Sequence, residues 1–314
     1  MKTTPLLVTL LICSHALAVE LDVRNAAEFA KCASPASELR RLGTDMRFLE
    51  GPQWVPAAAG GYLVFSDIPS NRIQRWTEKE GVTVWREPSG NANGNTVDSR
   101  GRVLTAEHGG RRISRTEADG SVTTVADQFE GRKLNSPNDV VVAADGAVYF
   151  TDPDYGLPTD PATKQRTGKE QAGDFVYRCD PERGTVEKVA GDFVKPNGLC
   201  FSPDGRRLYV ADSGGPRHIR VFDVGTGGRL ENGRVFCQID KGGPDGIRCD
   251  REGRVWSSAG DGVHVFAPSG ELLGKVLVPE SPANLAFGGE DMGTLFITAR
   301  KSLYALKVDA RGLR

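Results

Sequence analysis

Six polar side chains recur along the chain, each at the start of an apolar-alternating segment, and four of them could bind a hard metal ion. The six residues lie 43, 45, 59, 48 and 39 positions apart: Glu50, Asn93, Asn138, Asn197, Asp245 and Asn284. The four candidate ligands, Glu50, Asn138, Asn197 and Asp245, would supply two carboxylates and two amide oxygens. Such a donor set suits Ca²⁺ or another hard divalent cation, and the absence of Cys and His from it argues against a structural zinc site.

A period of this size predicts a repeat architecture, and one polar residue per repeat at one structural level predicts a ring. Within each repeat, β-branched and aromatic runs such as Tyr62–Phe65 and Arg72–Trp76 alternate with clusters of Gly, Asp, Asn and Pro, which is typical of short strands joined by tight turns. We therefore expect an all-β fold, a six-bladed β-propeller with four-stranded antiparallel blades. The innermost strands line the central channel, so their first residues should converge at one mouth.

The sixth repeat ends after its third strand, Ser302–Leu306. We expect residues 39–48, which precede the first repeat, to supply the missing outer strand, because a ring closed by the N-terminal segment leaves no exposed sheet edge there. The long spacing contains a polar insertion, residues 155–173, which we expect to form a loop that shapes a binding face.

Residues 1–18 resemble a secretory signal, with Lys2, an apolar stretch and the small-residue end Ala16-Leu17-Ala18. We expect export to the periplasm or the medium, and one propeller domain over residues 19–314. The apolar stretch is too short to span a bilayer, so membrane insertion is not expected. Removing the leader leaves five cysteines. This odd number favours buried free thiols over a disulfide framework.

The charge balance points to a small partner. Lys plus Arg number 40 against 41 for Asp plus Glu, and no basic stripe occurs, so nucleic-acid binding is not expected. We expect a monomer or a weak dimer that binds a small molecule.

Four ordered motifs carry a resemblance to a known family: Glu50-Gly51-Pro52, Ser136-Pro137-Asn138-Asp139, Pro196-Asn197-Gly198 and Pro244-Asp245-Gly246. Over about residues 45–310 the chain resembles the SMP-30/gluconolactonase family. The resemblance implies a six-bladed propeller that hydrolyses lactones with one divalent metal at the channel mouth. It favours Ca²⁺, with Mg²⁺, Mn²⁺ or Zn²⁺ as alternatives.

The resemblance also assigns roles. Glu50, Asn197 and Asp245 match the family's metal ligands, and Asn138 matches an Asn that lies close to the metal and contacts the substrate. Asp245 also matches the proposed general base. Because a bound cation would lower the basicity of Asp245, a metal-bound water or His108 is an alternative base.

Further candidates for substrate binding are Asn93 and Asn95 at the ring level of the second repeat, His108, and Ser136. A turn role for the two Asn residues and an exposed loop position for His108 are the structural alternatives. Ser136 replaces an Arg that helps to hold the sugar in animal members. Glu107, beside His108, could also reach the mouth, and Asp152 with Asp154 could hold a second cation or simply form a turn.

These features predict an exported, metal-dependent lactonase acting on a glucono-1,5-lactone-like substrate, a hydrolase of carboxylic ester bonds. The alternatives are a metal-dependent esterase or phosphotriesterase with the same fold, and a non-catalytic propeller that binds a carbohydrate or a protein. A Gly-x-Ser-x-Gly motif is absent, so the usual serine-hydrolase route is not available.

Overall fold

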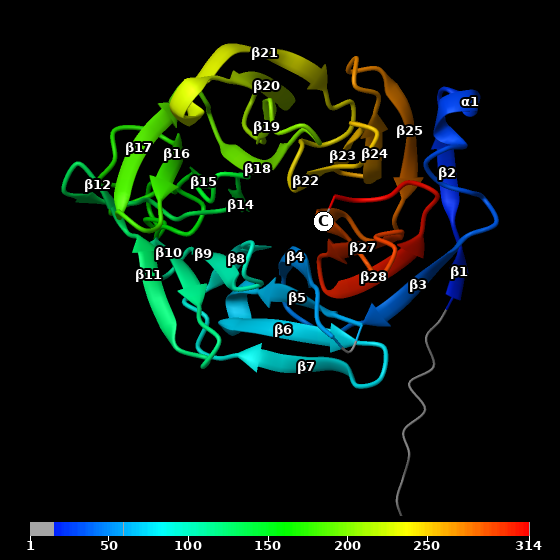
Figure 1. Ribbon diagram of the computed structural model, residues 1–314, viewed down its shortest axis with the longest axis horizontal. Helices are drawn as coiled ribbons and strands as arrows, with labels where there is room; N and C mark the ends of the chain where they lie inside the picture. Colours follow the sequence, from blue (N-terminus) through cyan, green and yellow to red (C-terminus); the bar gives the residue numbers. More distant parts are fainter. Residues whose placement is uncertain (1–15, 59, 314) are drawn as a thin grey trace, which may run out of the picture.

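Six antiparallel sheets are arranged around a central axis in the computed structural model, which describes residues 16–58 and 60–313 (Figure 1). From β4 onward the chain passes from one sheet to the next around the ring in sequence order, and it enters each sheet at the innermost strand. The prediction of a six-bladed β-propeller is confirmed.

The first three blades each contain four strands in sequence order. Blade 1 consists of β4 (Leu49–Val55), β5 (Tyr62–Asp67), β6 (Arg72–Thr77) and β7 (Gly81–Arg86), with the short helix η1 (Ile68–Ser70). Blade 2 consists of β8 (Ala92–Val97), β9 (Val103–Glu107), β10 (Arg112–Thr116) and β11 (Val122–Ala126), followed by the small hairpin β12 (Gln128–Phe129) and β13 (Arg132–Lys133). Blade 3 consists of β14 (Val140–Val142), β15 (Val148–Asp152), β16 (Phe175–Asp180) and β17 (Thr185–Ala190).

The last three blades repeat this pattern, and two of them gain strands from the N-terminal segment. Blade 4 consists of β18 (Pro196–Phe201), β19 (Arg207–Asp212), β20 (His218–Val224) and β21 (Leu230–Gln238), with η2 (Thr226–Gly228). Blade 5 contains β22 (Ile247–Cys249), β23 (Val255–Ser258), β24 (Gly262–Phe266), β25 (Leu272–Leu277) and β2 (Glu20–Val23). Blade 6 contains β26 (Pro282–Gly288), β27 (Thr294–Ala299), β28 (Ser302–Lys307), β3 (Glu38–Gly43) and β1 (Ala16–Ala18), and α1 (Ala26–Phe29) lies between β2 and β3.

The N-terminal segment closes the ring as expected. Strand β3 pairs antiparallel with β28, with Leu39 opposite Leu306. Two additions were not predicted: β1 extends blade 6 beyond β3, and β2 adds a fifth strand to blade 5. The predicted secretory leader falls mainly on residues 1–15, which lie outside the described residues, and its last residues form β1. The leader therefore stays a prediction.

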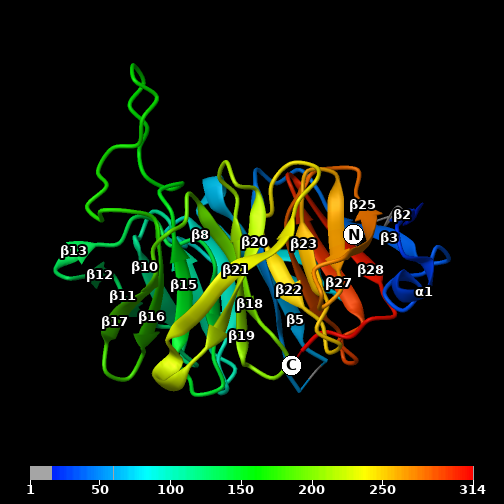
Figure 2. The same ribbon diagram turned by 90° about the horizontal axis from the view of Figure 1, so that it is seen from above.

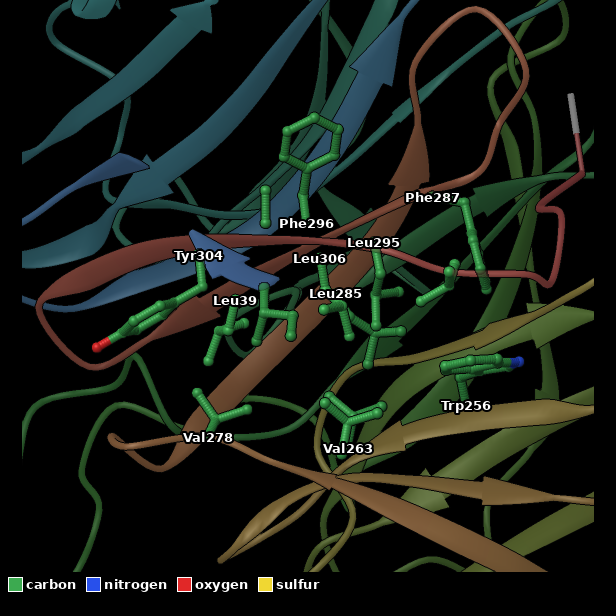
Figure 3. Close-up of a cluster of buried hydrophobic side chains, with 14 of the residues drawn as sticks. Leu39, Trp256, Val263, Val278, Leu285, Phe287, Leu295, Phe296, Tyr304 and Leu306 are labelled. Atoms are coloured by element: carbon green, nitrogen blue, oxygen red, sulfur yellow. The ribbon is translucent and has the colours of Figure 1, made fainter. Parts of the chain in front are cut away.

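The closing strand is anchored by apolar packing. Leu39 of β3 is buried together with Leu285, Leu295 and Leu306 of blade 6 and with Trp256 of blade 5 (Figure 3). Burying one leucine side chain stabilises a fold by about 1.5–3 kcal/mol. The two buried leucines of β3, Leu39 and Leu42, thus fix this segment against the last blade.

The insertion between β15 and β16 is a loop, as predicted, apart from one isolated bridge between Thr159 and Arg166. It projects from one face of the propeller, as the long green segment of Figure 2. Five cysteines, Cys32, Cys179, Cys200, Cys237 and Cys249, are buried and unpaired, which agrees with the free-thiol interpretation. Across residues 16–58 and 60–313, no helix is long and apolar enough to cross a membrane.

Candidate functional site

Irregular pairing at the start of the inner strands directs the ring residues toward the channel. In blade 2, Asn93 and Gly94 together lie opposite one residue of β9, and in blade 4 Asn197 and Gly198 do the same against β19. The pairing of β4 shifts directly after Glu50. Such bulges bend a strand and re-aim its side chains, and they are common beside functional sites. In blades 3 and 5, the ring residues precede the shorter strands β14 and β22.

Hydrogen bonds link every blade to the next at this level. Blades 2 and 3 are joined by Gly94 N donating to Asn138 O (2.8 Å), and blades 4 and 5 by Gly198 N donating to Asp245 O (3.1 Å). The remaining steps are made by Ser66 Oγ to Asn93 O, Thr151 Oγ1 to Asn197 O, Gly246 N to Ala283 O and Asn284 Nδ2 to Glu50 Oε2. The six ring residues are therefore held in one continuous network.

Two glycines allow this close approach. A Cβ atom at Gly198 would collide with the carbonyl oxygen of Asp245, and a Cβ at Gly94 would lie 2.5 Å from Asp139 Oδ1. Gly51 has φ of 49°, a left-handed conformation that favours glycine. A Cβ at Gly51 would collide with Asn93 O, and one at Gly246 with the Asn284 side chain. The glycine that follows each of Glu50, Asn197 and Asp245 in the sequence motifs is thus a packing requirement of the ring.

The Glu50 carboxylate is buried, with 4% of the residue exposed. Its Oε2 accepts hydrogen bonds from Gly51 N (3.0 Å) and Asn284 Nδ2 (3.1 Å). Burial raises the pKa of Glu50, and the nearby charge of Asp245 raises it further. No salt bridge to Glu50 is present among the described residues, so its charge is not balanced by a basic side chain.

Asp245 lies half-buried beside Asn197 in the channel. Burial raises the pKa of Asp245 to about 7, a hydrogen bond from Asn197 lowers it, and the charge of Asp139 raises it. Among the described residues neither Glu50 nor Asp245 forms an ion pair with a basic side chain, and a nearby negative charge raises the pKa of each carboxyl. Glu50 and Asp245 therefore form a site where a positive charge would be stabilised.

The donor set fits a hard divalent cation. The charge of Asp245 acts on Glu50, Asn197 hydrogen bonds to Asp245, and Asn138 O accepts from Gly94 N beside Asn93, so the four predicted ligands belong to one connected ring. The buried Oδ1 of Asn93 has no hydrogen-bond partner. Within the described part of the chain, no three His, Cys, Asp or Glu residues gather as a metal cluster. The site offers two carboxylates and several amide oxygens, the ligands that Ca²⁺ and Mg²⁺ prefer.

His108 belongs to this end of the channel and is buried rather than exposed on a loop. Its Nε2 lies 3.0 Å from Asn93 Nδ2. Burial, together with the charge of Arg166 in the insertion, lowers the pKa of His108 to about 4. The imidazole is therefore neutral at neutral pH and can accept the Asn93 hydrogen bond.

Two other residues predicted to bind substrate, Asn95 and Ser136, are buried and hydrogen bonded to other protein groups. Asn95 is fully buried: its Nδ2 donates to Gly51 O, Ser66 Oγ and Asn93 O, and its Oδ1 accepts from Thr105 Oγ1. Ser136 is also fully buried, and its hydroxyl donates to Pro153 O (2.6 Å) and accepts from Gly156 N (2.9 Å). Both residues support the ring and the insertion, and their contact with substrate stays a prediction.

Of the other carboxylates singled out from the sequence, Glu107 and Asp154 have basic partners, whereas Asp152 accepts from a backbone amide. Glu107 points into blade 2, where it pairs with Arg86 and Arg112. Asp154 pairs with Lys195, and Asp152 accepts a hydrogen bond from Asn135 N (2.8 Å). Asp154 is thus compensated by a lysine instead of a second cation.

Tyr155 is a site residue that sequence reasoning missed. It begins the insertion and lies beside Lys195, whose Nζ is 5.8 Å from its ring centre. Burial and the charge of Asp245 raise the pKa of Tyr155 to about 12, while a hydrogen bond with Ser213 lowers it. The next residue, Gly156, packs so closely on His108 that an added Cβ would lie 2.5 Å from the His108 Cβ. No repeat pattern signals these contacts, because the insertion occurs in one blade alone.

Comparison with known proteins finds one family that matches most of the chain. The model of the SMP-30/Gluconolactonase/LRE-like region matches residues 48–301. A gluconolactonase of Zymomonas mobilis is 34% identical, with 86% of this chain and 81% of that protein covered. The solved structure of a gluconolactonase from Xanthomonas campestris has a TM-score of 0.85 at 35% identity, covering 95% of this chain and 99% of that one. Regucalcin of Agrobacterium tumefaciens, a calcium-binding protein, shares the fold with a TM-score of 0.70 at 23% identity, covering 87% of this chain and 94% of its own.

Proposed function

Because the chain belongs to the SMP-30/gluconolactonase/LRE-like family, we propose that it hydrolyses a sugar lactone of the glucono-1,5-lactone type at the channel mouth. The family and its gluconolactonase relatives support a hydrolase of carboxylic ester bonds that opens lactones. The observation that carries the proposal for this chain is the pair of unbalanced carboxylates, Glu50 and Asp245, facing one channel end.

We propose that Glu50, Asn197 and Asp245 hold one divalent cation, with Asn138 beside it, and that Ca²⁺ is its first candidate. A cation bound there would supply Lewis acidity toward the lactone carbonyl. The calcium-binding regucalcin fold and the all-oxygen donor set support this assignment.

We assign proton transfer and substrate binding to side chains of the protein. In this proposal Asp245 takes a proton from an attacking water, and the hydrogen bond with Asn197 orients the Asp245 carboxylate. Neutral His108 is the alternative proton acceptor, although its Nε2 already faces the Asn93 amide. Asn93 Oδ1, which is buried without a partner, is a candidate acceptor for a substrate hydroxyl.

The test is hydrolysis of glucono-1,5-lactone by the purified protein, followed with a pH indicator before and after chelation with EDTA. We expect activity to be lost on chelation and to return with Ca²⁺, Mg²⁺, Mn²⁺ or Zn²⁺ supplied singly. Activity that survives complete removal of metal would contradict the proposed role of the cation. A protein that binds metal yet opens no lactone would point to other esters or phosphotriesters.

We also propose that the protein is exported, on the basis of the leader-like residues 1–18. N-terminal sequencing of the protein recovered from outside the cytoplasm tests this. Cleavage after Ala18 is the expected result, and an intact N-terminus in the cytoplasmic fraction would contradict it.

A further inference from the structure

A third carboxylate is buried in the channel, one residue further along the chain than Asn138. Asp139 is fully buried; its Oδ1 accepts from Val140 N (3.0 Å) and packs against Gly94. Its charge contributes to the raised pKa of both Glu50 and Asp245. Asn284, which donates to Glu50, also hydrogen bonds to Asp139. The three acidic groups thus act on one another electrostatically.

One basic residue reaches this group from another blade. Arg248 Nη1 donates to Asp139 Oδ2 at 3.3 Å and to Ile247 O at 2.7 Å. Arg248 lies on β22 of blade 5, whereas Asp139 precedes β14 of blade 3, so the ion pair links two blades that are not neighbours. The charges of both groups act on Cys200 of β18, the inner strand of blade 4 between them. Of the ion pairs formed by the described residues, this is the one that involves any of the three carboxylates.

We propose that Arg248 sets the charge that a bound ion meets at the ring, and thereby the preference of the site for a divalent cation. By neutralising Asp139, it leaves Glu50 and Asp245 as two unbalanced negative charges, equal and opposite to the charge of one divalent ion. Arg248 is a positioning residue in this scheme, since it acts through Asp139. The inference rests on the proposed function, because it requires a cation at the ring.

The wild type and three variants test the proposal, because they change the net charge of the four side chains in single steps. Arg248→Met removes the positive charge and keeps a long apolar stem, so three negative charges remain. Asp139→Asn leaves Arg248 unbalanced and reduces the net charge to one negative unit. The double variant, Asp139→Asn with Arg248→Met, restores two negative charges without the ion pair.

The readout is metal affinity, measured on EDTA-stripped protein at mildly alkaline pH by calorimetry with Ca²⁺ and by luminescence with Tb³⁺. In Arg248→Met, the ratio of Tb³⁺ affinity to Ca²⁺ affinity should be about tenfold higher than in the wild type. Asp139→Asn should bind Ca²⁺ about tenfold more weakly than the wild type. The double variant should lie within about threefold of the wild type, because the charge effects cancel.

Each other outcome has a distinct meaning. Unchanged metal affinities in all three variants would overturn the inference. So would a loss of metal affinity in both single variants that adds up in the double variant, because a purely structural role of the ion pair gives that result. A wild type that binds neither ion would instead overturn the proposed function. If Arg248→Met alone does not fold, the comparison of Asp139→Asn with the double variant still decides, since recovery of Ca²⁺ affinity requires the charge mechanism.

Discussion

Glu50 and Glu107 are both buried glutamates at the mouth side of the propeller, yet their surroundings are opposite. Glu107, 1% exposed, accepts from Arg86 Nη2 (2.7 Å), Arg112 Nε (2.7 Å) and Ser114 Oγ (2.6 Å). Glu50, 4% exposed, accepts from one backbone amide and one Asn side chain. Burying a carboxylate is unfavourable unless it is paired. The protein completes the Glu107 site itself and leaves the Glu50 site to be completed by something it binds.

The largest expected effect is loss of turnover when the unbalanced pair is neutralised. Glu50→Gln and Asp245→Asn should each reduce lactone hydrolysis by at least about 10³-fold, because the charge that holds the cation and stabilises the developing oxyanion is lost. The metal-free fold should be no less stable, since a buried unpaired charge is removed. Measurements of kcat/KM and of thermal unfolding in EDTA check both parts. Retained activity with unchanged metal content would remove these residues from the roles assigned.

At Glu107, whose charge is balanced by arginines, we expect substitution to reduce stability. Glu107→Gln leaves Arg86 and Arg112 without their shared carboxylate and should lower the free energy of unfolding by about 3–5 kcal/mol. Glu117→Gln, which alters a partly exposed pair with Arg102 and Arg115, is the matched control and should change it by less than about 1 kcal/mol. Urea unfolding compares the two. Equal effects would mean that the Glu107 network is not a structural ion-pair cluster.

Substituting a glycine of the ring should reduce the free energy of unfolding by an intermediate amount. Gly198→Ala forces a Cβ against the carbonyl of Asp245 and should destabilise the fold by about 1–3 kcal/mol. It should also reduce activity, because Asp245 is displaced. Gly215→Ala is the control, since nothing lies within 4 Å of its added Cβ. If the two variants behave alike in urea unfolding and turnover, the ring tolerates more expansion than its packing implies.

His108 should make stability depend on pH in the acidic range. Its pKa is lowered from the ordinary value of 6.5 to about 4 by burial, so the neutral form is favoured in the folded state. The resulting stability is fully present above pH 6.5 and is lost as the pH falls through about 4, up to about 3 kcal/mol. His108→Gln should flatten this part of the profile. A wild-type slope that persists unchanged in the variant would contradict the assignment.

Tyr155 should give the smallest effect. Tyr155→Phe removes the hydroxyl beside Asp245 and Ser213 but keeps the ring, and should lower kcat/KM for glucono-1,5-lactone by about threefold to tenfold, the worth of one hydrogen bond. Ser213→Ala should act in the same direction, because it removes the partner of that hydroxyl. Steady-state kinetics with metal restored checks the change, and unchanged kinetics in both variants would place Tyr155 outside the substrate's reach.

The repeat explains how much the sequence could predict. Glu50, Asn197 and Asp245 mark the same level in their blades, so the ring followed from their spacing. The closing segment at Leu39 followed from the missing fourth strand of the sixth repeat. Tyr155 belongs to an insertion without a counterpart in other repeats, and its position depends on tertiary packing against Lys195 and His108. The Arg248–Asp139 pair joins residues 109 positions apart, and nothing in the local pattern of either strand indicates it.

The pairing of β3 with β28 has a consequence for biosynthesis. Residues 38–43 are translated about 260 residues before the strand that receives them, residues 302–307. The N-terminal segment therefore lacks its sheet partner while about six blades of chain are translated. Contacts between residues so far apart in the sequence also form slowly. During that interval blade 6 cannot be completed, so closure of the ring, and with it the final placement of Asn284 against Glu50, must follow the synthesis of residues 302–307.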